Sequence, residues 1–110
     1  MREDVKEYID KYSNDIKEMY LSLRKLLIDS VPCDVEENLW AKLPSYNVGD
    51  SFVRIIPFKD HINIEATAID KYRNELKDFK ITSKGMLQIY LKQNIPQDIL
   101  KHIFKETLIG

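Results

Sequence analysis

The sequence predicts an α+β fold, in which helices pack on one face of a mostly antiparallel sheet. Apolar residues recur with a helical period at both ends of the chain, whereas in the middle they alternate along short segments. No βαβ unit is repeated, which argues against a parallel sheet. The expected element order is ααβββαβα. A chain of 110 residues has the size of one domain, so we expect residues 1–110 to share a single core.

Two helices are expected at the N-terminal end. The first covers residues 2–12. Its apolar face consists of Val5, Tyr8, Ile9 and Tyr12. Ser13 suits the N-cap of the second helix, because its hydroxyl can accept a hydrogen bond from an unpaired amide of the first turn. The apolar face of this second helix consists of Ile16, Met19, Tyr20, Leu23, Leu26 and Leu27. Pro32 should end it near residue 29 or 30.

Three strands are expected next, joined as an antiparallel meander. The first covers residues 37–43, where apolar and polar side chains alternate until Pro44 interrupts the strand. Residues 47–50 have the composition of a turn, and residues 51–57 are rich in β-branched and aromatic side chains. This second strand should therefore return beside the first. After another tight turn, residues 61–65 form the third strand.

The remainder of the chain predicts a helix, a strand and a final helix. Residues 67–79 carry apolar side chains at helical spacing and begin with a near capping box. Gly85 then releases the chain into a strand over residues 86–91. Pro96 fits the first position of the last helix, where its missing amide proton costs nothing.

Composition and charge exclude several classes of protein. Residues 1–50 hold 11 acids and 7 bases, and residues 51–110 hold 7 acids and 10 bases. Neither half has the concentrated positive charge that holds a phosphate backbone, so we expect no nucleic-acid partner. No apolar run reaches the roughly 18 to 20 residues that cross a bilayer, so no membrane role is expected. Cys33 is the single cysteine, and a cytoplasmic location is the expectation.

Four short motifs resemble the YdhG family of small bacterial proteins. The motifs are Asp4 to Ile9 (DVKEYI), Trp40 to Tyr46 (WAKLPSY), Phe58 to Ile62 (FKDHI) and Thr82 to Gly85 (TSKG). The resemblance spans nearly the whole chain, and it implies one cytoplasmic α+β domain of a type long classed as a domain of unknown function. Some relatives are described as frataxin-like iron chaperones. For this chain the resemblance therefore implies delivery of Fe²⁺ or Fe³⁺ to iron–sulfur or haem assembly proteins.

Acidic side chains on the first two helices are the candidate iron ligands. Glu3, Glu7 and Asp10 lie within about 60° of one another on a helical wheel, opposite the apolar face. Asp15 and Glu18 extend this acidic strip onto the next helix. Carboxylates suit iron held weakly on a surface. The alternative is the solvated face of an amphipathic helix, whose dipole favours acids near its N-terminus.

A second candidate site takes an anion. Lys59 and His61 precede and begin one strand, and Ser83, Lys84 and Gly85 precede another. If these turns meet at one edge of the sheet, backbone amides and two lysines would suit a carboxylate or a phosphate. The alternative is that the lysines are solvated and that His61 bonds a nearby carbonyl.

Catalytic and zinc chemistry find no support in the sequence. The two histidines, His61 and His102, have no cysteine or second histidine at a spacing that closes a zinc site. Ser45 and Ser83 lack the glycines of a nucleophile elbow, so we expect no enzyme.

Trp40 and Tyr46 flank Pro44, and two environments are open to them. They could anchor a partner or a homodimer on a sheet face that no helix covers, or they could pack under the long helices. The leading hypothesis is a frataxin-like iron-binding protein. The alternative is a non-enzymatic binding module for a small anionic ligand or a protein partner, with dimerisation open.

Overall fold

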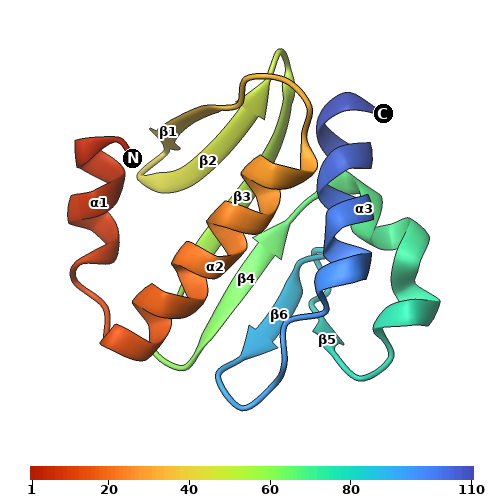
Figure 1. Ribbon diagram of the computed structural model, residues 1–110. Coiled ribbons are helices and arrows are strands. Elements are labelled where there is room, and N and C mark those ends of the chain that lie inside the picture. Colours follow the sequence, from red (N-terminus) through yellow and green to blue (C-terminus); the bar gives the residue numbers. More distant parts are fainter.

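A six-stranded antiparallel sheet with helices on one side forms the protein, which is described here for residues 1–110 of a computed structural model (Figure 1). The helices are α1 (Glu3–Ile9), α2 (Asn14–Ser30), the 3₁₀ helix η1 (Thr67–Leu76) and α3 (Gln97–Ile109). The strands are β1 (Glu36–Trp40), β2 (Leu43–Val48), β3 (Ser51–Pro57), β4 (His61–Glu65), β5 (Lys80–Ile81) and β6 (Leu87–Tyr90). Their order in the sheet is β1-β2-β3-β4-β6-β5, so the predicted α+β class is confirmed.

The N-terminal helices follow the predicted signals closely. The Ser13 hydroxyl accepts a hydrogen bond from the Ile16 amide at 3.3 Å and caps α2 as expected. Helix α2 ends at Ser30, two residues before Pro32. Helix α1 is shorter than predicted: it ends at Ile9, although Tyr12 still packs against the core.

The prediction of one strand over residues 37–43 was wrong, because a turn divides this segment. The chain turns at Ala41 and Lys42, whose φ angles are +49° and +68°, and β2 then runs back beside β1. Two successive residues with positive φ make the tight turn that suits the twist of a hairpin. Pro44 therefore lies inside β2, opposite Leu39, and does not end a strand. The meander has four strands, because this hairpin precedes β3 and β4.

Two further differences lie between β4 and β6. The predicted helix over 67–79 is a 3₁₀ helix that ends at Leu76, and Tyr72 within it has non-helical angles (φ −110°, ψ 18°). A short strand that the sequence did not predict, β5, pairs with β6. This added hairpin sets the direction of β6, which runs antiparallel to β4.

The hydrophobic core lies between the helices and one face of the sheet. Alternate strand residues such as Val53, Ile55, Ile62 and Ile64 join a cluster of 22 buried residues with side chains from α1, α2 and α3. Figure 1 shows these helices on the same side of the sheet. No helix has the length and apolar character that crossing a membrane requires.

Candidate binding surfaces

The acidic strip is dispersed in the structure. Glu3 and Glu7 are exposed on α1 as predicted, but Asp10 forms ion pairs of 2.9 Å with both Lys6 and Lys17. Hydrogen bonds from these two lysines hold the pKa of Asp10 below its usual value. No three acids, histidines or cysteines come close enough together to hold a metal ion.

The other two candidate iron ligands lie beside a groove. Asp15 and Glu18 line a hollow of about 670 Å³ between α2 and the loop that precedes α3. A second hollow of about 490 Å³ continues along α2 and shares Ser22, Ile95 and Gln97 with the first. The two acids thus belong to a polar groove between helices and do not extend the α1 carboxylates into one site.

The predicted anion pocket is wrong, because its two halves lie at opposite ends of a strand pair. His61 pairs with Tyr90 in the β4–β6 ladder, whereas Gly85 lies beyond the other end, past the Ile64–Leu87 pair. Three residue steps of about 3.4 Å separate these pairs, so the turns are at least roughly 10 Å apart. Lys59 and His61 therefore do not meet Ser83, Lys84 and Gly85.

Each half of that predicted pocket has local partners instead. The His61 Nδ1 atom lies 2.8 Å from the Asp60 carboxylate, and this hydrogen bond lowers the pKa of Asp60. Ser83, Lys84 and Gly85 border a hollow of about 350 Å³ together with residues of η1. There Asp70 and Arg73 already form an ion pair with each other. Gly85 has a φ of +86°, which a residue with a side chain rarely adopts.

The most unusual surface is the side of the sheet that faces away from the helices, here called the outer face. Its residues are Glu36, Asn38, Trp40, Leu43, Ser45, Asn47, Phe52, Arg54, Ile56, Phe58, His61, Asn63, Glu65, Lys80, Gln88 and Tyr90. They share this side because the side chains alternate along each strand. None of them belongs to the hydrophobic core cluster under the helices.

Arg54 anchors the first of two groups on the outer face. Its guanidinium lies 4.0 Å from the ring centroids of both Trp40 and Phe52, and it donates a 2.7 Å hydrogen bond to Glu65. Stacking of this kind favours a guanidinium held in one position. The residue is only 8% exposed, and its Nε has no hydrogen-bond partner.

Three stacked rings form the second group. Phe58 and His61 have centroids 4.7 Å apart with an interplanar angle of 6°, and Tyr90 lies 4.7 Å from the other side of the imidazole at 29°. These residues are neighbours across β3, β4 and β6, so the sheet register sets the row. Phe58 remains well exposed.

Ile56 and Asn63 are direct partners across β3 and β4, between the two groups. Both are buried although neither belongs to the core under the helices. Asn63 is 8% exposed; its amide nitrogen meets the Met86 sulfur at 3.9 Å, and its Oδ1 has no partner. The centre of the outer face is thus buried and holds one donor, Arg54 Nε, and one acceptor, Asn63 Oδ1, without a hydrogen-bond partner.

Trp40 and Tyr46 separate onto the two sides of the sheet. Tyr46 is completely buried under the helices, where its hydroxyl lies 2.6 Å from that of Tyr20. Trp40 is 58% exposed on the outer face. The prediction that both aromatics share one environment was wrong, because Pro44 and Tyr46 follow a turn and Trp40 precedes it. Sequence alternation identified Trp40, whereas Arg54 and Asn63 gave no sequence signal.

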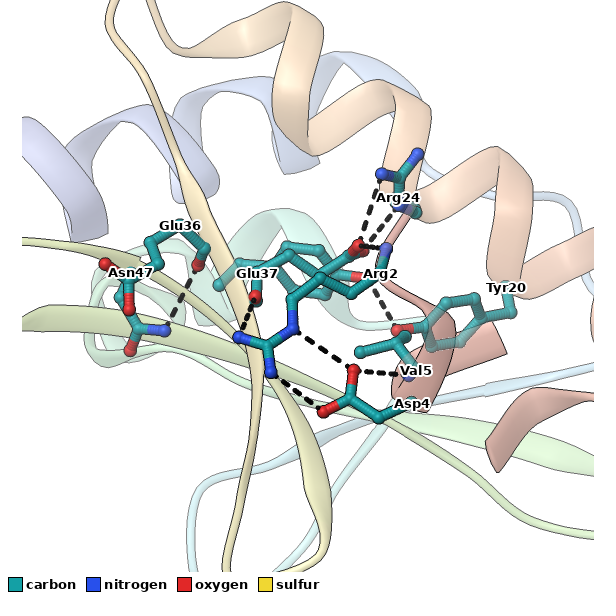
Figure 2. Close-up of polar contacts among 9 residues, drawn as sticks. Arg2, Asp4, Val5, Tyr20, Arg24, Glu36, Glu37 and Asn47 are labelled. Carbon is teal, nitrogen blue, oxygen red and sulfur yellow. Dashed lines mark hydrogen bonds and ion pairs between the residues drawn. The ribbon is translucent and has the colours of Figure 1, made fainter. Parts of the chain in front are cut away.

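A polar network ties the N-terminus to the sheet on the inner side (Figure 2). The Glu37 carboxylate accepts hydrogen bonds from Arg24 Nε at 2.6 Å and from the Arg2 amide at 2.8 Å. Burial would raise the pKa of Glu37, but the hydrogen bonds from Arg24 and Arg2 outweigh it and lower the pKa. Glu37 therefore holds α1 and α2 to the first strand and does not face a ligand.

No protein-family model, curated protein or solved structure matches the chain.

Proposed function

We propose that the protein is a non-enzymatic binding module that engages a partner through the outer face of its sheet. The observation that carries this proposal is the Arg54 guanidinium held between Trp40 and Phe52 on a face without helices. Trp, Tyr and Arg are the side chains that dominate binding energy at protein interfaces. A position that is already ordered in the free protein loses little side-chain entropy when a partner binds.

The rest of the outer face has the layout of an interface. Ile56 and Asn63 are buried at its centre, and aromatic side chains flank them on both sides. Of these aromatics, Trp40 and Phe58 are exposed large side chains. Aromatic residues of this kind are enriched at interfaces and often anchor the partner.

Site-specific photo-crosslinking tests the proposed function. A benzophenone amino acid replaces Trp40 on the outer face, and in a control protein it replaces Leu21, which is 43% exposed on α2. Both proteins are irradiated in cells. We expect discrete crosslinked products from position 40, because that side chain lies at the contact, and none from position 21. Equal crosslinking at both positions, or none at position 40, would refute the proposal.

Iron delivery stays a prediction from the family resemblance, with iron as cargo on carboxylates. Its expected ligands are Glu3, Glu7 and Asp10, of which Asp10 is engaged with two lysines. We expect weak binding in an anaerobic calorimetric titration and loss of binding in the triple variant Glu3→Gln/Glu7→Gln/Asp10→Asn. Calcium and magnesium serve as controls for unselective carboxylate binding. Unchanged iron binding in the triple variant would remove this site.

A further inference from the structure

We infer that the partner on the outer face is a second copy of this chain, packed sheet against sheet in a two-fold dimer. This inference rests on the proposed function, since it names the occupant of the same surface. Most homodimers have two-fold symmetry, and their interface is then one patch that is complementary to itself. The outer face meets this requirement in its size, its charge and the placement of its two aromatic groups.

The size of the outer face is that of a small, weakly associating dimer interface. Six adjacent strands span roughly 25 Å at about 4.8 Å per step, and strands of up to seven residues are roughly 20 Å long. The flat area is therefore about 500 Å², before side-chain relief is counted. Two such faces bury about 1,000 Å² in total, or about 500 Å² on each copy, which is less than the roughly 800 Å² per partner of a standard interface and is typical of weak association. A second sheet about 10 Å away, as in packed sheets, would cover this whole surface.

The charge of the outer face permits contact with an identical surface. The outer face holds two basic residues, Arg54 and Lys80, and two acidic residues, Glu36 and Glu65, so their formal charges cancel. Arg54 also forms an ion pair with Glu65 of its own copy. Two identical faces without net charge do not repel each other. The same balance argues against a polyanion such as nucleic acid, which needs concentrated positive charge.

The two aromatic groups are also complementary to each other across a two-fold axis. Trp40 on β1 and Phe58 after β3 are both exposed on the outer face. In a two-fold dimer each contact occurs twice. An axis that passes between the two aromatic groups therefore sets Trp40 of one copy against the Phe58, His61 and Tyr90 row of the second copy.

Sedimentation equilibrium of the purified full chain tests this inference. We expect a reversible dimer between about 5 and 500 µM, and at least a tenfold weaker association for Trp40→Ala and for Phe58→Ala. Both side chains are exposed, so both variants should fold, which circular dichroism checks. The matched control Leu21→Ala should associate like wild type.

Two outcomes would overturn the inference. One is a monomeric wild type over the whole range, and the other is a dimer that neither Trp40→Ala nor Phe58→Ala weakens. A monomeric chain that still crosslinks from position 40 to another protein would leave the proposed function standing and remove only the second copy. A monomeric chain without crosslinks from position 40 would remove both.

Discussion

Replacing Glu37 with alanine is expected to lower the free energy of unfolding by about 3 kcal/mol, because it leaves a partly buried arginine without its counter-ion. The Glu37 side chain is 9% exposed, and its carboxylate accepts hydrogen bonds from Arg24 and from the amide of Arg2. Its loss removes the link that holds α1 and α2 to β1. Urea denaturation followed by circular dichroism measures the change.

The matched control for Glu37 is Asp29, which forms an exposed ion pair with Lys25 on α2. Asp29→Ala should change the free energy of unfolding by less than about 0.5 kcal/mol, since solvent screens such a pair. If Glu37→Ala destabilises the protein no more than Asp29→Ala does, the Glu37 network does not hold the N-terminus in place.

The lowered pKa of Glu37 also predicts how the free energy of unfolding changes with pH. A carboxyl whose pKa is lower in the folded state stabilises the protein above its unfolded pKa, about 4.5, and this contribution is lost as the pH falls through the folded value. Wild type should therefore lose more stability than Glu37→Gln between about pH 5 and pH 3. Parallel denaturation curves at several pH values measure the difference.

Removing one hydroxyl of the Tyr20–Tyr46 pair is the second large effect that we expect. The two oxygens lie 2.6 Å apart in the core, so Tyr20→Phe leaves the Tyr46 hydroxyl short of a partner. A buried polar group left unpaired costs about 1 to 3 kcal/mol. The double variant Tyr20→Phe/Tyr46→Phe should cost less than the sum of the single variants, because no hydroxyl is then left alone.

A double-mutant cycle by urea denaturation measures this coupling, and strictly additive effects would contradict it.

The Tyr20–Tyr46 pair also predicts how the free energy of unfolding changes at alkaline pH. Burial raises the pKa of both tyrosines above the ordinary value of 10.0. Stability should therefore decrease as the pH rises above about 10, where the unfolded chain ionises first.

Signals that act within a few residues were readable from the sequence. The Ser13 cap, the stop before Pro32 and the helical period of α2 and α3 all appear in the structure. The hairpin at Ala41 and Lys42 was missed because neither residue is a glycine or asparagine, the residues that usually mark a turn with positive φ.

The anion pocket and the acidic strip depended on how separate helices and strands lie next to one another, which the sequence does not show. The expected meeting of His61 with Ser83, Lys84 and Gly85 required β4 and β6 to be parallel neighbours. The unpredicted strand β5 turns the chain once more, so β6 runs antiparallel and its first residues lie at the far end. In the acidic strip, a helical wheel of α1 cannot show that Lys17 of α2 pairs with Asp10.

The fluorescence of Trp40 tests most directly whether a second copy of the chain covers the outer face. Trp40 is the single tryptophan and lies on that face, so its emission reports on that surface alone. The account predicts that emission shifts to longer wavelength, and that acrylamide quenching increases, as the protein is diluted from about 500 to about 1 µM. Emission and quenching that stay constant over this range, at wavelengths typical of exposed indole, would contradict coverage of the outer face by a second copy.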